Sequence, residues 1–179
     1  MRWINRTLAA LAIVMMAGSA SATMIEIGAV VKNNANAAAD FTIDFFPEVG
    51  DTLPAIISQI QGSIGVTATD QNNDGVTLTG QIFYSATIDG QEVLQLLKNV
   101  NLVGAAGATV IDAETSPPVA INPAIAGAQA AKVTIKFTLS AGDNASFTGQ
   151  ANIVPEPSTV LLFGSGLMGL IAMGRRRKA

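Results

Sequence analysis

One short segment of this chain has side chains at the spacing of a metal-binding loop. Side-chain oxygens occupy its first, third and fifth positions, at Asp70, Asn72 and Asp74, and Gly75 takes the sixth position. These are the first ligands of a Ca²⁺ loop of the EF-hand type. The twelfth position is Gln81, where such a loop needs a bidentate glutamate. Because tight turns also select Asn, Asp and Gly, we favour a polar hairpin turn and keep a weak Ca²⁺ site as the alternative.

Other groups that carry catalysis are scarce in this sequence. The chain has no histidine and no cysteine, which removes imidazole bases, thiol nucleophiles and the usual zinc ligands. Asp112 and Glu114 could share one face of a strand, as the two carboxylates of a glycosidase would, but solvated acids on a strand edge explain them better. We therefore expect a protein that is not an enzyme and that needs no cofactor.

The charge of the central region argues against a nucleic-acid partner. Between Thr23 and Val154 there are 12 acidic residues and 4 lysines, so this region has a net charge near −8. The other cations all lie in the two terminal segments. Binding to a phosphate backbone needs a basic surface, and this region would repel it.

The N-terminal 22 residues have the layout of a secretory signal peptide. Two arginines precede an apolar run from Leu8 to Ala17, and small residues follow it. Such a run is too short to span a membrane stably, and Ala20 and Ala22 suit the pocket of a signal peptidase. We predict export through the secretory translocon and cleavage after Ala22, so that the mature chain begins at Thr23.

The C-terminal end joins an extended motif, an apolar segment and a basic cluster. The motif, residues 154–159, contains Pro155, Glu156 and Pro157, and its prolines favour an open, extended backbone. Residues 160–174 are apolar or small and would form a helix of about 22 Å, which can span the inner membrane if the bilayer thins locally. The positive-inside tendency keeps the basic stop in the cytoplasm and leaves the preceding chain on the periplasmic side. That stop consists of Arg175, Arg176, Arg177 and Lys178.

This order of parts resembles the PEP-CTERM protein-sorting domain of Gram-negative bacteria. The resemblance covers residues 154–179 only, and it is strengthened by the signal peptide on the same chain. It implies that an exosortase, a membrane-embedded transpeptidase-like enzyme, recognises Pro155, Glu156 and Pro157 and cuts near them. It also implies a destination at the cell surface or in an extracellular matrix of exopolysaccharide, as in biofilms. It implies nothing about the chemistry of residues 23–153.

Residues 23–153 form a passenger domain that we predict to be mainly β. Short segments rich in Val, Ile, Thr and Phe alternate between apolar and polar residues and are separated by Gly, Asn and Asp. An antiparallel β-sandwich fits this pattern, and a jelly roll is one form of it. The expected strands are Phe41–Phe45, Val66–Thr69, Val76–Thr79, Gln81–Ile88, Val100–Val103, Thr109–Ile111, Lys132–Leu139 and Ser146–Ile153.

Three segments of the passenger do not follow this pattern. Leu53–Ile60 and Gln91–Leu97 have apolar residues at helical spacing, so we expect one or two short helices there. Residues 116–131 contain several prolines followed by Ala and Gly, and they predict a long loop.

Taken together, the sequence predicts an exported, non-catalytic protein of the cell surface or matrix. A carbohydrate-binding or Ca²⁺-dependent adhesive module is the first alternative. A plain envelope protein held in the membrane by its C-terminal helix is the second.

Overall fold

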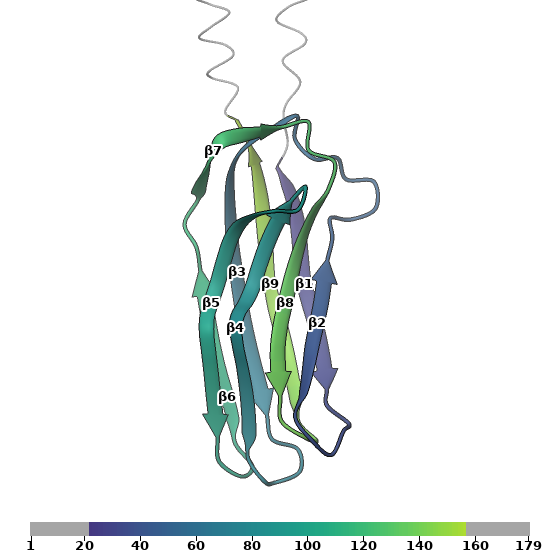
Figure 1. Cartoon of the computed structure of the whole chain (residues 1–179), viewed down its shortest axis with the longest axis vertical. Helices are drawn as coiled ribbons and strands as arrows, with labels where there is room; N and C mark the ends of the chain where they lie inside the picture. Colours follow the sequence, from purple (N-terminus) through teal and green to yellow (C-terminus); the bar gives the residue numbers. More distant parts are fainter. Residues whose placement is uncertain (1–21, 157–179) are drawn as a thin grey trace, which may run out of the picture.

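The structure, a computed structural model, describes residues 22–156. These residues form nine strands in two sheets that face each other (Figure 1). The predicted membrane helix, the basic stop and all of the predicted signal peptide except Ala22 lie outside the described residues. The strands are β1 (Thr23–Lys32), β2 (Ala39–Phe45), β3 (Ile56–Thr69), β4 (Val76–Ile88), β5 (Gln91–Gly104), β6 (Thr109–Thr115), β7 (Val119–Ala126), β8 (Ala131–Leu139) and β9 (Asn144–Pro155).

The strand order is that of a jelly roll. The first sheet has the order β1-β9-β3-β6, with β7 also paired to β3, and the second has the order β2-β8-β4-β5. All pairs are antiparallel. Apart from the β4–β5 hairpin and the step from β6 to β7, every connection passes from one sheet to the other, which is how a double-sheet jelly roll is built. The predicted antiparallel β fold is confirmed.

The core lies between the two sheets, and its buried residues alternate most regularly along β3 and β9. In β9, Ala145, Phe147, Ala151 and Ile153 are buried while their neighbours are more exposed, the period of two expected for a strand with one wet face. The ring of Phe147 reaches across the interface to Phe137 of β8, with 4.8 Å between ring centroids. All eight predicted strands lie inside observed strands. The prediction missed β1, whose second half, Gly28-Ala29-Val30-Val31, does not alternate in polarity.

The two predicted helices are wrong, because β-bulges imitate helical spacing. Within residues 22–156 there is no helix, and none therefore is long and apolar enough to cross a membrane. In β3 the register shifts between Ile57 and Gln59, so that Ile57 and Ile60 both face the core although they are three residues apart. In β5, Leu97 has a φ of 51°, and both Leu96 and Leu97 are buried.

The predicted loop at residues 116–131 is also partly wrong. Its middle forms β7, which pairs with residues 56–60 of β3. Pro123 is tolerated there because β7 is short and lies at the sheet edge, where a missing N–H is not needed by a further strand.

Candidate functional site

The predicted tail motif begins inside the last strand of the sandwich. Val154 lies opposite Gln59 and Pro155 lies opposite Ile57 in the β9–β3 pair. The backbone N–H of Glu156 then donates to the carbonyl of Ile56 at 3.1 Å. The predicted boundary between residues 153 and 154 therefore falls within β9, and no linker separates the sandwich from the motif. Pro157 lies outside the described residues.

The predicted start of the mature chain lies beside this point. Thr23 pairs with Ile153 in the β1–β9 ladder, so β1 begins where β9 ends (Figure 1). Thr23 is 4% exposed, and its hydroxyl donates to the carbonyl of Thr52 at 2.9 Å. The first strand thus starts directly after the predicted cleavage position at Ala22. We call this end of the sandwich, with Thr23 and Pro155, the tail end.

The sequence comparisons concern this same segment. Residues 154–178 match the family model described as the PEP-CTERM protein-sorting motif. The chain carries a PEP-CTERM sorting motif. This motif implies an exported, membrane-anchored precursor and an exosortase as its processing partner. The match covers the tail and none of the sandwich before Val154.

Comparisons of the whole chain add little to the sorting motif. A search of curated proteins found no match. Among solved structures, the chain is similar to the T13 IBDV viral particle, with a TM-score of 0.31 and 14% identity over 78% of this chain and 40% of that one. It is also similar to the infectious bursal disease virus VP2 subviral particle, with a TM-score of 0.18 and 11% identity over 88% of this chain and 49% of that one. The chain spans less than half of those chains, and TM-scores this low support no argument about function.

The segment with Ca²⁺-loop spacing lies at the opposite end of the sandwich, which we call the far end. It joins β3 to β4, which belong to different sheets, so it is a crossover between sheets and the predicted hairpin is wrong. The far end consists of four loops, residues 33–38, 70–75, 105–108 and 140–143 (Figure 1).

Asp70 organises this far end through backbone hydrogen bonds. One of its carboxylate oxygens accepts the N–H groups of Asn72 and Asn73, at 3.1 and 2.9 Å, and the other accepts those of Gly75 and Gly107, at 3.0 and 2.6 Å. Burial raises the pKa of Asp70, but these donors, led by Gly107, lower it more, so its pKa lies below the ordinary value. The carboxylate therefore ties the β3–β4 loop to the β5–β6 loop.

A third carboxylate, which the sequence did not point to, joins Asp70 and Asp74. The carboxylate oxygens of Asp70, Asp74 and Asp143 lie within 4.8 Å of one another. Asp143 is fully buried and accepts the N–H of Gln71 at 3.1 Å and the hydroxyl of Ser140. Because it is about seventy residues from Asp70 along the chain, only the fold brings it here. These bonds favour a structural role for the cluster, and Ca²⁺ binding stays a prediction.

Asn72, the remaining predicted ligand, links two loops of the far end. Its side-chain amide donates to Asp74 and to the carbonyl of Ala141, both at 2.9 Å. It therefore bridges the β3–β4 loop and the β8–β9 loop, and its side-chain oxygen accepts the backbone N–H of Asp74 at 3.3 Å.

Asp112 and Glu114 of β6 have separate local partners. Asp112 accepts the N–H of Ala113 at 2.8 Å. Glu114 accepts the N–H of Leu97, at the point where β5 departs from regular strand geometry. Glu114 thus supplies an acceptor to a residue of positive φ in the other sheet, which supports a structural role.

Proposed function

We propose that this protein is exported, held in the inner membrane by its C-terminal tail and transferred by an exosortase to the cell surface or the extracellular matrix. The match of residues 154–178 to the sorting motif carries this proposal. In it, Pro155, Glu156 and Pro157 are the recognition residues, and Arg175 to Lys178 halt export behind the membrane segment.

The geometry of the tail end sets a condition on processing. Val154 and Pro155 are paired with β3, and the N–H of Glu156 is bonded to Ile56. An enzyme that reads this motif as an extended strand must therefore engage it beyond Glu156, or separate the last residues of β9 from β3. Either way the enzyme works directly against the tail end of the sandwich.

We further propose that the sandwich is a non-catalytic passenger. The chain lacks histidine and cysteine, and the carboxylates of Asp70, Asp143 and Glu114 are used to bind backbone N–H groups. These observations support a role in binding or scaffolding.

Replacing the motif tests the sorting function. With Pro155, Glu156 and Pro157 all changed to alanine, in cells that contain an exosortase, we expect export to continue and a membrane-retained precursor to accumulate. This precursor should exceed the wild-type product by the mass of the tail. The matched control is the double variant Pro47→Ala and Glu48→Ala, because it removes a Pro-Glu pair from the β2–β3 connection at the same end of the sandwich. It should be processed as wild type.

A second variant distinguishes sorting from simple anchoring. Deletion of residues 160–179 should send the passenger past the membrane without an anchor, since no other segment after the signal is long and apolar enough to span. If the triple alanine variant is processed and located as wild type, the motif is not recognised. The protein would then be an envelope protein with an ordinary C-terminal anchor.

A further inference from the structure

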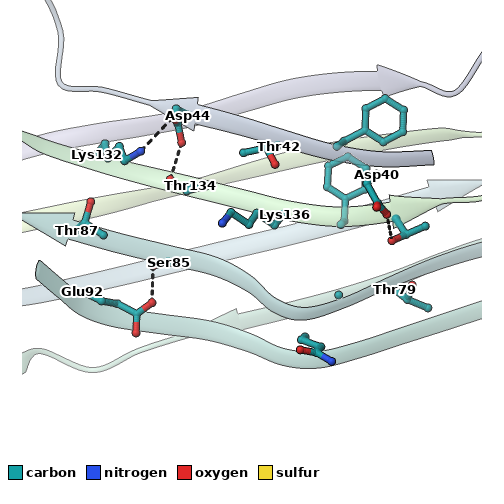
Figure 2. Close-up of a pocket in the computed structure, with 15 residues that line it drawn as sticks. Asp40, Thr42, Asp44, Thr79, Ser85, Thr87, Glu92, Lys132, Thr134 and Lys136 are labelled. Atoms are coloured by element: carbon teal, nitrogen blue, oxygen red, sulfur yellow. Dashed lines mark hydrogen bonds and ion pairs between the residues drawn. The ribbon is translucent and has the colours of Figure 1, made fainter. Parts of the chain in front are cut away.

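The outward face of the β2-β8-β4-β5 sheet carries an open groove. Its volume is about 760 Å³, and residues from all four strands line it (Figure 2). This volume lies within the range of ligand-binding clefts, about 300–1,000 Å³. Four strands spaced by about 4.8 Å make the groove roughly 14 Å wide across the sheet, so it has room for a segment of a chain molecule.

The lining is polar because one face of each strand presents threonine, serine and charged side chains. Across the β2–β8 pair, Asp40 lies opposite Thr138, Thr42 opposite Lys136, and Asp44 opposite Thr134. Ser85 of β4 continues the last of these rows on the other side of Thr134. The result is rows of hydroxyl, carboxylate and ammonium groups that all point away from the core.

Hydrogen bonds between these side chains hold part of the lining in place. Thr134 donates to Asp44 at 2.5 Å, and Lys132 forms an ion pair with the same carboxylate at 3.2 Å. Ser85 donates to Glu92 at 2.7 Å. A lining fixed in this way loses little side-chain freedom when a ligand binds.

Two other groups in the middle of the groove have no such partner. Figure 2 draws no bond from Thr42 or Lys136 to the other lining residues, and Lys136 forms no ion pair within residues 22–156. Beside Lys136, the pairing of β4 with β8 is interrupted between Thr79 and Tyr84. Gly80 lies in this interruption, and a Cβ there would stand 2.9 Å from the carbonyl of Lys136, so the site leaves no room for a larger residue. At the centre of the groove, therefore, β4 and β8 are not paired and position 80 has no side chain. The polar groups of Thr42 and Lys136 are left without a partner in the lining.

The charge of the groove selects among hydroxyl-rich ligands. Its lining has three carboxylates, Asp40, Asp44 and Glu92, and two ammonium groups, Lys132 and Lys136. Together with the excess of acids over lysines in the rest of the passenger, this disfavours a polyanion. A sugar hydroxyl both donates and accepts hydrogen bonds. A carboxylate can accept from it, an ammonium group can donate to it, and a hydroxyl side chain can do either.

We propose that this groove binds a neutral polysaccharide chain. The two phenylalanines of the lining, Phe41 and Phe137, stack on each other with 5.3 Å between ring centroids. Because these two rings stack on each other, the proposal does not rely on a ring stacked on a sugar. The affinity comes from several hydrogen bonds along the polysaccharide chain. The proposal goes beyond sorting by the tail, because a sandwich whose tail is never processed would bind the same ligand.

Calorimetry on the full-length chain, in micelles of a detergent without a sugar headgroup, tests this binding. The neutral probes are hexasaccharides of the cellulose, laminarin, maltose and mannan series, and an alginate hexamer is the anionic probe. We expect at least one neutral probe to bind and the alginate hexamer to bind more weakly. The double variant Thr42→Ala and Lys136→Ala should weaken neutral binding by about tenfold or more, equivalent to about 1.4 kcal/mol. These two side chains are exposed, so the fold should be retained.

The matched control removes the same residue types from the other sheet. Lys32 and Thr148 are exposed on the outward face of the β1-β9-β3-β6 sheet, and the variant Lys32→Ala with Thr148→Ala should bind as wild type. The proposal is overturned if no neutral probe binds at millimolar concentration. It is also overturned if the alginate hexamer binds more tightly than every neutral probe, or if the groove and control variants bind equally. None of these outcomes bears on whether the tail is processed.

Discussion

Glu156 donates its backbone N–H to the carbonyl of Ile56, and this bond is the last that joins the sorting motif to the sandwich. It follows directly on the pairing of Pro155 with Ile57. The first half of the motif is therefore part of the folded domain. Val154, Pro155 and Glu156 belong both to the sorting motif and to the sandwich.

Freeing the motif should speed its processing. Insertion of Gly-Gly-Ser-Gly between Ile153 and Val154 would remove Val154, Pro155 and Glu156 from β3 while leaving their sequence intact. We expect faster conversion of precursor to product in a pulse-chase experiment, because the enzyme no longer has to open the end of β9. The same insertion after Gly50, in the β2–β3 connection, is the control. An unchanged rate would mean that the enzyme acts only beyond Glu156.

The contact between Gly62 and Tyr84 should be intolerant of added volume. A Cβ on Gly62 would stand 2.7 Å from the Tyr84 hydroxyl, and Tyr84 is fully buried. We expect Gly62→Ala to lower the free energy of unfolding by about 1–3 kcal/mol in urea denaturation, as overpacking does.

Removal of the Tyr84 hydroxyl should not destabilise the fold. Its buried hydroxyl has no hydrogen-bond partner among residues 22–156, so Tyr84→Phe should be neutral or stabilise by up to about 1 kcal/mol. Because it removes one of the two closest atoms, the other being Leu94 Cδ2 at 2.8 Å, it should also reduce part of the cost of Gly62→Ala in the double variant. Strictly additive effects would show that the two residues do not compete for space.

Asp70 should stabilise the fold by accepting backbone N–H groups and not by binding a metal ion. It accepts four N–H groups, whereas exposed Asp74 accepts one side-chain bond from Asn72, so Asp70→Asn should lower the unfolding midpoint more than Asp74→Asn. Calorimetry on the full-length chain should find Ca²⁺ binding no tighter than about 1 mM, the weak end of extracellular sites. Micromolar binding that is lost in both Asp70→Ala and Asp74→Ala would reverse this assignment.

Stability should fall in acid because Asp44 and Asp70 have lowered pKa values. For Asp44, the Thr134 hydrogen bond lowers the pKa most, burial opposes it, and Lys132 lowers it further. In the unfolded chain these carboxyls titrate near 3.8, and in the folded chain they bind protons only at lower pH. Their contribution to the free energy of unfolding is therefore complete above about pH 5 and is lost as the pH falls through the folded pKa.

Urea denaturation between pH 7 and pH 3 measures this loss. Asp44→Asn and Thr134→Val should each make the decline below pH 5 shallower than in wild type. Thr148→Val, the same exchange on the outward face of the other sheet, should keep the wild-type decline. The assignment fails if both groove-side variants follow the wild-type curve.

The sequence predicts strands well wherever polarity alternates without interruption. Phe41–Phe45 is such a case, and its burial alternates as expected. At Ile57 a bulge adds a residue and moves the next apolar side chain to the same face. At Leu97 the register with β4 is unchanged, and a positive φ accompanies the burial of two consecutive leucines. A single sequence does not distinguish that spacing from a turn of helix. The prediction of a helix at Gln91–Leu97 did not use the Asp89-Gly90 pair, a dipeptide typical of hairpin turns, and both residues have positive φ in the β4–β5 turn.

The tail motif is encoded within a few adjacent residues, so the sequence alone revealed it. The groove and the far-end cluster are different in kind. Lys136 and Thr42 are 94 positions apart and meet only because β2 and β8 pair, and Asp143 meets Asp70 only because β3 and β9 pair, with Thr69 opposite Asn144. Sites of this type depend on strand order, which local patterns do not specify.

Because Thr23 lies opposite Ile153, the adjacency determines which end of the sandwich faces the surface to which the protein is attached. Signal cleavage and tail processing would both act at one pole, so the loops of the far end would face away from whatever surface holds the protein. Residues 34–38 lie in one of those loops and are exposed. A peptide epitope inserted after Asn36 would therefore be displayed outward on intact cells, whereas one placed in the β2–β3 connection would be held close to the site of attachment.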